Sequence, residues 1–140
     1  MEEGVLYILG PGTTLMAVAE QLGVEKTPLG VDAVVDSRLV GRDLNEGELL
    51  RLLDRYPRAK VVVSPLGGQG FILGRGNQQI SPEILRRVGR ENIIVLATKD
   101  KMEGLKTLRV DTGDPKVDGM LRGYMRVIVD YMEERVIRVA

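Results

Sequence analysis

The residues best suited to binding a ligand are concentrated between Pro65 and Pro82, where five glycines alternate with polar side chains. Glycine permits left-handed backbone conformations and lets main-chain amides approach a ligand closely. Glycine also marks tight turns, so two turns flanking a short strand at Phe71–Leu73 explain the residue types equally well. The candidate ligand-binding residues of this stretch are Gly67, Gly68, Gln69, Gly70, Arg75, Gly76, Asn77 and Gln78.

A second candidate site follows the apolar run Val5–Leu9, which is typical of a strand buried on both faces. Here the glycine turn Gly10-Pro11-Gly12 precedes a helical pattern that ends at Leu22, and Thr13 or Thr14 is expected to cap that helix. A strand, a glycine turn and a helix N-terminus together favour phosphate binding, because free amides and the helix dipole point to one place. A third glycine is missing at Leu15, so a plain strand-to-helix turn remains an alternative. The candidate phosphate-binding residues are Gly10, Gly12, Thr13 and Thr14.

Further polar residues follow other predicted strands. Thr98 and Lys99 come directly after the apolar segment Asn92–Ala97, and ligands of open α/β sheets bind at the carboxyl ends of strands. The carboxylates of Asp32, Asp36 and Asp111 are candidate contacts to a ribose or a metal ion. Together these groups suit an anionic ligand rich in hydrogen-bonding groups, such as a nucleotide or a sugar phosphate.

The amino-acid composition limits the partners and metal ions that the chain is expected to bind. The 140 residues include 20 basic and 20 acidic side chains, so the basic footprint of a nucleic-acid-binding protein is missing. The absence of cysteine and histidine argues against zinc, haem and iron–sulfur centres, and leaves an oxygen-ligated ion such as Mg²⁺ as the expected metal. No apolar run is long enough to span a bilayer, and we expect a cytoplasmic protein. The lack of cysteine and the excess of arginine over lysine favour a thermophilic source.

Strand and helix patterns alternate along most of the chain. Helices are predicted over 14–22, over 46–56 behind an Asn45 cap, and from Ser81 onward, with buried strands between them. The alternation predicts one domain over residues 1–140 with a three-layer α/β fold: a mainly parallel sheet with helices on both faces. The segment from Tyr124 to Val139 is predicted as an antiparallel C-terminal hairpin, with a helix over 124–134 as the alternative.

Several strings resemble one known family. ILGPGTT, LGVDAVVD, SPLGGQGFILGRGNQQISPE and LRVDTGDP, followed by GYMRVIVDY, are similar to the C-terminal part of the archaeal and bacterial predicted polyphosphate- or ATP-dependent NAD kinases. The resemblance extends from Val5 to about Val139, and its most specific piece is GRGNQQISP, from Gly74 to Pro82.

The resemblance implies phosphorylation of NAD to NADP, with ATP or polyphosphate as the donor and a divalent metal such as Mg²⁺. The family's Gly-Gly-Asp-Gly motif, which supplies the activating aspartate, does not occur here, because Gly67-Gly68-Gln69-Gly70 has glutamine in its third place. No catalytic residue is therefore carried over. Better-studied NAD kinases hold a ribose through an Asn-Glu pair, which implies a contact through Asn45 and Glu46. They also have a β-sandwich C-terminal domain, whereas the pattern here predicts α/β.

Two functions from different classes remain open. The chain is expected to be the nucleotide-binding C-terminal portion of an NAD kinase-like enzyme, inactive alone and completed by a partner that contains the Gly-Gly-Asp-Gly motif. The alternative is a stand-alone module that senses a nucleotide or phosphometabolite without chemistry. In either case we expect a homo-oligomer, with neither nucleic acid nor membrane as a partner.

Overall fold

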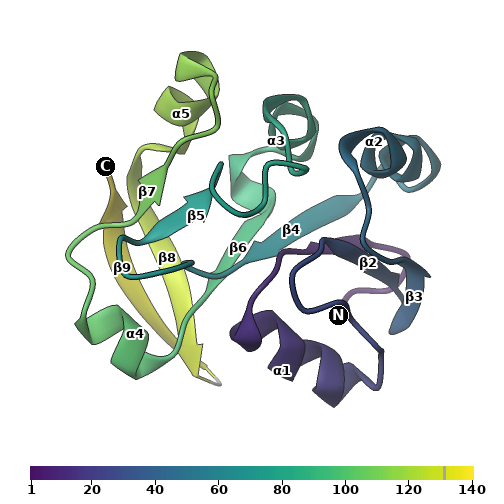
Figure 1. Cartoon of the computed structure of the whole chain (residues 1–140), viewed down its shortest axis with the longest axis horizontal. Helices are drawn as coiled ribbons and strands as arrows, with labels where there is room; N and C mark the ends of the chain where they lie inside the picture. Colours follow the sequence, from purple (N-terminus) through teal and green to yellow (C-terminus); the bar gives the residue numbers. More distant parts are fainter. Residues whose placement is uncertain (131) are drawn as a thin grey trace.

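Seven strands form a mixed sheet in the computed structural model, which describes residues 1–130 and 132–140 (Figure 1). The strand order is β3-β2-β1-β4-β6-β8-β9, and a separate two-stranded sheet consists of β5 and β7. The strands are β1 (Leu6–Leu9), β2 (Asp32–Val35), β3 (Arg38–Gly41), β4 (Ala59–Val63), β5 (Phe71–Leu73), β6 (Ile93–Leu96), β7 (Arg109–Val110), β8 (Gly123–Asp130) and β9 (Glu133–Val139). The helices are α1 (Thr13–Leu22), α2 (Glu46–Arg55), α3 (Pro82–Val88), the 3₁₀ turn η1 (Arg90–Asn92), α4 (Lys99–Glu103) and α5 (Pro115–Leu121).

The four central strands β1, β4, β6 and β8 run parallel to one another. Their carboxyl ends therefore lie along one edge of the sheet, and the segments after them can meet there. Antiparallel strands extend the sheet at both ends, β2 and β3 beside β1, and β9 beside β8. Because β2 is antiparallel to β1, its first residue, Asp32, lies opposite Leu9 at this same edge.

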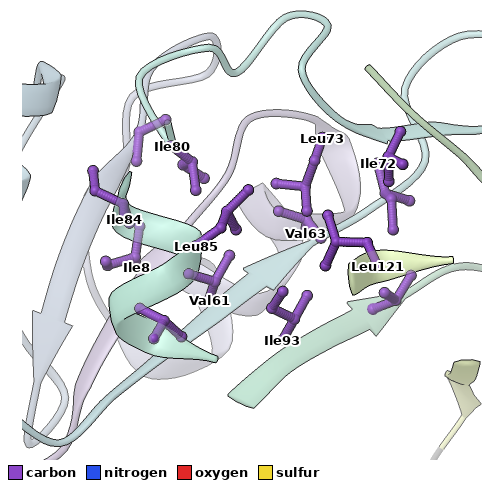
Figure 2. Close-up of a cluster of buried hydrophobic side chains, with 14 of the residues drawn as sticks. Ile8, Val61, Val63, Ile72, Leu73, Ile80, Ile84, Leu85, Ile93 and Leu121 are labelled. Carbon is purple, nitrogen blue, oxygen red and sulfur yellow. The ribbon is translucent and has the colours of Figure 1, made fainter. Parts of the chain in front are cut away.

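Helices α2, α3 and α5 cover one face of the sheet. Figure 2 shows Ile84 and Leu85 of α3 and Leu121 of α5 in the same buried cluster as Val61 of β4 and Ile93 of β6. All five side chains are buried, and apolar burial of this kind is the main favourable contribution to folding. This large cluster holds the central strands in place beneath the loops at their carboxyl ends.

The opposite face is covered by α1, which lies on the other side of the sheet in Figure 1. Leu15 of α1 packs in a second cluster with Tyr7 and Leu9 of β1 and Val62 of β4. The cover does not extend to the hairpin β8–β9, where Tyr124 and Val136 remain 72% and 66% exposed. The sheet is thus buried on both faces around β1 and β4, and on one face only around β8 and β9.

The predicted α/β fold, with helices on both faces and a C-terminal antiparallel hairpin, is confirmed. The alternative of a helix over 124–134 is wrong, since β8 and β9 occupy this part; Tyr131 lies outside the described residues. The short helix α4 was not expected from the sequence. None of the helices in the described ranges is long and apolar enough to cross a membrane.

Candidate functional site

A polar pocket of about 300 Å³ lies where the segments following β1, β4 and β6 meet. Parallel strands bring these three segments to one edge of the sheet, the usual place for a ligand in an open α/β fold. We call this cavity the strand-end pocket. Its lining consists of Gly12, Thr13, Thr14, Ser64, Pro65, Leu66, Gly67, Thr98 and Lys101.

The N-terminus of α1 opens into the strand-end pocket without a side-chain cap. Gly12 is the N-cap residue, at a φ of 113°, and no side-chain hydrogen bond caps the helix. The expectation that Thr13 or Thr14 caps α1 is wrong, because both lie inside the first turn. The first amides of a helix have no partner within it, and they carry the positive end of the helix dipole. These amides and the two threonine hydroxyls can therefore bind an anion.

The second wall of the strand-end pocket is the start of α4. The Thr98 hydroxyl caps this helix by accepting a hydrogen bond from the Lys101 amide over 3.1 Å, and its own proton remains available for donation. The Lys101 ammonium donates to the Gly67 carbonyl over 2.5 Å. Since an ammonium has three donors, two are left for an anionic ligand, and its positive charge adds to that of the α1 dipole.

Lys99, which sequence reasoning placed in the site, points elsewhere. Its ammonium lies 2.8 Å from a Glu133 carboxylate oxygen and 3.8 Å from one of Asp130, both on the C-terminal hairpin. The hydrogen bond to Glu133, together with the charge of that carboxylate, raises the pKa of Lys99 above its ordinary value. Lys99 thus fastens α4 to the hairpin, and Lys101 is the lysine that lines the pocket.

The glycine-rich segment approaches the strand-end pocket through Leu66. The Leu66 amide donates to the Phe71 carbonyl over 2.9 Å and closes a tight loop with Gly67, Gly68 and Gln69 exposed at its tip. A Cβ atom at Gly12 would lie 3.3 Å from the Leu66 side chain, and one at Gly76 would lie 3.0 Å from it. The two glycines therefore allow the α1 turn and the loop near Gly76 to close around Leu66.

Gly70, Gly74 and Asn77 hold the glycine-rich segment in shape. A Cβ atom at Gly70 would lie 2.7 Å from the Thr107 carbonyl oxygen, and one at Gly74 would overlap the carbonyl of Asp111. Asn77 is buried. Its side-chain oxygen Oδ1 accepts a hydrogen bond from the Gly74 amide over 3.0 Å, and its side-chain nitrogen Nδ2 donates to the Ile72 carbonyl over 2.9 Å. The side chain of Asn77 is thus committed to the turn, while Gln78 is exposed.

Arg75 lies at the tip of this turn and does not line the strand-end pocket. Its guanidinium carbon is 4.2 Å from the centre of the Phe71 ring, and its Nε donates to Asp111 over 3.1 Å. These residues border a different cavity, of about 520 Å³, together with Arg109 and Arg138. The structure therefore separates Arg75 and Asp111 from the groups that follow β1, β4 and β6.

Asp32 is fully buried in an ion pair that sequence reasoning missed. Its carboxylate lies 2.8 Å from the Lys26 ammonium, and both side chains are 0% exposed. It also accepts hydrogen bonds from the amide and hydroxyl of Thr27 and from the Asp43 amide. Lys26 donates in addition to the carbonyls of Thr27 and Gly30. With all these groups satisfied, Asp32 anchors the loop before β2 and is not open to a ribose or a metal ion.

That anchored loop in turn supports the first glycine turn. The Gly12 amide donates to the Pro28 carbonyl over 3.2 Å, so the N-cap of α1 is tied to the segment that the Lys26–Asp32 pair fixes. Asp36 lies at the other end of β2, where its side chain accepts from the Gly4 amide over 2.9 Å. The structure therefore does not bring Asp36 to the strand-end pocket.

Asn45 and Glu46 start helix α2. The Asn45 side chain accepts from the Glu48 amide over 2.8 Å, and the Glu48 carboxylate accepts from the Asn45 amide over 3.1 Å, which is a complete capping box. Glu46 lies in the first turn, where a negative charge stabilises the helix dipole. The geometry accounts for both residues by helix capping, and neither lines the strand-end pocket.

Replacement of Asn45 by alanine is expected to lower the free energy of unfolding by about 1 kcal/mol, because the capping hydrogen bond to Glu48 is lost. Asn45→Ser should recover most of this loss, since serine also caps helices. Urea unfolding of both variants measures the effect. If Asn45→Ser unfolds like the wild type but loses affinity for NAD or ATP, Asn45 contacts a ligand as well.

The strand-end pocket suits an anion rather than a metal ion. No carboxylate is among its lining residues, whereas amides, hydroxyls and one ammonium are. Within residues 1–130 and 132–140 there is also no group of three acidic side chains that could hold a metal. These residues fit the phosphates of a nucleotide, and they do not fit a Mg²⁺ ion held by the protein alone.

The position of Lys101 in the sequence could have placed it in the candidate site, because it follows β6 in the same polar segment as Thr98 and Lys99. Ser64 follows β4 directly and could have been found by the same rule. Lys26 had no such signal, since nothing in its local pattern indicates burial.

The family model described as the ATP-NAD kinase C-terminal domain matches residues 2–139. Searches of curated proteins and of solved structures found no match.

Proposed function

The chain belongs to the ATP-NAD kinase C-terminal domain family, and on this premise we propose that it is the nucleotide-binding portion of an NAD kinase-like enzyme. The strand-end pocket would hold phosphates of NAD or ATP. A partner domain or subunit would supply the catalytic groups, so the chain alone is expected to be inactive. The observation that carries this proposal is the uncapped N-terminus of α1, which faces Thr98 and Lys101 across the pocket.

The chemistry of these groups supports phosphate binding. Main-chain amides at a helix start donate to phosphate oxygens, and the helix dipole favours the negative charge. The Thr14 and Thr98 hydroxyls add neutral donors, and the Lys101 ammonium adds a charge-assisted hydrogen bond. The Lys26–Asp32 pair and the Gly12–Pro28 hydrogen bond hold the turn before α1 in place before any ligand arrives.

The same pocket has no group that could activate a hydroxyl. Phosphoryl transfer to a ribose needs a base or orienting carboxylate near the attacking oxygen, and the lining of the strand-end pocket contains none. Mg²⁺ would arrive with the nucleotide phosphates. This lack supports a need for a partner, and it equally supports the alternative of a stand-alone nucleotide sensor.

Replacement of Lys101 by glutamine is expected to weaken ATP binding about tenfold or more, because a charge-assisted hydrogen bond is lost. Lys116→Gln serves as the matched control, since Lys116 is an exposed lysine at the start of α5 that does not line the pocket. Titration calorimetry with ATP, with and without Mg²⁺, measures the affinities. Equal affinities in the wild type and Lys101→Gln, or no binding of ATP, NAD or polyphosphate to the wild type, would contradict the proposal.

A kinase assay separates the two functions. The purified chain should not convert NAD to NADP on its own with ATP and Mg²⁺. If activity appears when a protein containing the Gly-Gly-Asp-Gly motif is added, the chain is part of an enzyme. Nucleotide binding without activity in any such mixture would favour the sensor.

A further inference from the structure

An apolar groove runs along helix α1 beside the strand-end pocket. It has a volume of about 570 Å³ and lies between α1, the end of β6 and the end of β8. Its aliphatic walls come from Val18 and Leu22 of α1, Leu96 of β6 and Ile128 of β8. We call this cavity the helix-side groove.

The helix-side groove exists because α1 covers only part of its face of the sheet. Ile128 is 38% exposed, and Leu96 is only half-buried although it belongs to a central strand. On the opposite face the neighbouring residue Val95 is fully buried in the large cluster. An apolar surface next to a polar pocket in a soluble protein is characteristic of a ligand site.

The two cavities are adjacent and share two lining residues. Thr14 and Thr98 line both the strand-end pocket and the helix-side groove, so the groove begins where the phosphate-binding groups end. One end of the combined site has amides, hydroxyls and an ammonium, and the other end has aliphatic side chains. A ligand that reaches from one cavity into the other is expected to be anionic at one end and to present an apolar face at the other.

We propose that the helix-side groove binds the heteroaromatic base of a nucleotide whose phosphates lie in the strand-end pocket. This inference rests on the proposed function, which it deepens by assigning the second half of the ligand. The base packs against Val18, Leu96 and Ile128, and this burial removes apolar area of both partners from water.

Polar groups at the rim can select the base. Gln21 lines the groove, and its side-chain oxygen can accept a hydrogen bond from an exocyclic amine; the Asp130 carboxylate lies at the same rim. The Asp130 carboxylate lies 3.8 Å from the Lys99 ammonium, so Lys99 positions a group at the rim although it does not line the groove. The ribose would cross from one cavity to the other near Thr14 and Thr98.

The test compares ADP with inorganic pyrophosphate, which carries the phosphates alone. Titration calorimetry on the wild type should show ADP binding at least about tenfold more tightly, because the base adds contacts that pyrophosphate cannot make. Equal affinities would overturn the base site while leaving phosphate binding intact. Binding of neither probe would instead contradict the proposed function, so the two failures are distinguishable.

Ala17→Trp provides the structural control. Ala17 is an exposed residue of α1 that lines the groove and not the strand-end pocket, so an indole there should obstruct the base. We expect ADP affinity to fall about tenfold and pyrophosphate affinity to remain unchanged. Glu20→Trp, on the same helix but outside the groove, should leave both affinities unchanged.

Ile128→Thr gives a second test of base binding in the groove in case Ala17→Trp folds poorly. It removes part of the apolar wall at an already exposed strand position, and ADP affinity should fall several-fold while pyrophosphate binding is retained. Unchanged ADP affinity in both variants, or a parallel loss of ADP and pyrophosphate binding in both, would overturn the assignment of the groove.

Discussion

Replacement of Asp32 by asparagine is expected to lower the free energy of unfolding by about 3–5 kcal/mol, the usual effect of breaking a buried ion pair from one side. The change leaves the Lys26 ammonium buried without its counter-charge, at a site where both side chains are 0% exposed. It also places an amide group among donors, since Thr27 and Asp43 both donate to the Asp32 carboxylate. Against a typical total of about 5–15 kcal/mol, the loss is large enough to unfold a marginal domain.

Asp36→Asn is the matched control for this experiment. Asp36 lies on the same strand–turn segment, is exposed, and accepts a hydrogen bond from the Gly4 amide that asparagine can also accept. Its φ of 51° is a conformation that asparagine tolerates. We expect a change within about 0.5 kcal/mol. Urea unfolding of both variants decides the matter: similar stabilities would mean that Asp32 and Lys26 contribute little net energy.

Replacement of Gly74 by alanine is expected to lower the free energy of unfolding by about 3 kcal/mol or more, through two separate causes. A Cβ atom at this position would overlap the main-chain carbonyl of Asp111, and backbone cannot move aside as a flexible side chain does. The φ of 94° is also strained for any residue with a side chain. The collision separates β5 from β7, because the Asp111 amide donates to the Leu73 carbonyl beside it.

Gly113→Ala isolates the second of these causes. Its φ of 87° is similar, but a Cβ atom there would meet nothing within 4 Å. We expect a loss of about 1 kcal/mol from backbone strain alone. Thermal unfolding followed by circular dichroism gives the comparison. Equal losses in the two variants would show that the contact between Gly74 and Asp111 relaxes without cost.

Local patterns were enough to predict most of the fold. Val61–Val63 and Ile93–Ala97 are continuous apolar runs, and both form strands in the parallel centre of the sheet. Val61–Val63 are buried, as are Ile93 and Val95, whereas Ile94 and Leu96 are half-buried. Asn45 was expected to cap a helix and does so, because a capping bond depends on residues two or three positions apart. Asp114 caps α5 in the same way; desolvation alone would raise the pKa of its carboxyl, but the hydrogen bonds from the amides of Lys116 and Val117, together with the neighbouring Arg86, lower this pKa below its ordinary value.

The features that the sequence did not predict correctly depend mainly on contacts that form only in the tertiary fold. Lys26 meets Asp32 because a loop closes over the start of β2, and no periodicity records this closure. Lys99 turns toward Glu133 of a strand more than thirty residues later, which leaves the pocket to Lys101. α4 has only five residues and shows too little apolar periodicity to be recognised. In the candidate site the segments were therefore predicted better than the individual side chains.

The way in which the turn at Gly12 is held determines how the strand-end pocket responds to ionic strength. Mobile ions screen charges that face water over about 8–10 Å, and they have little effect on a pair from which water is excluded. Water is excluded from the Lys26–Asp32 pair, so salt has little effect on it. This pair fixes the loop whose Pro28 carbonyl accepts a hydrogen bond from the Gly12 amide. Lys101 is partly exposed, so mobile ions can screen its charge. Added salt should therefore weaken the attraction of an anion to the pocket while the shape of the pocket persists.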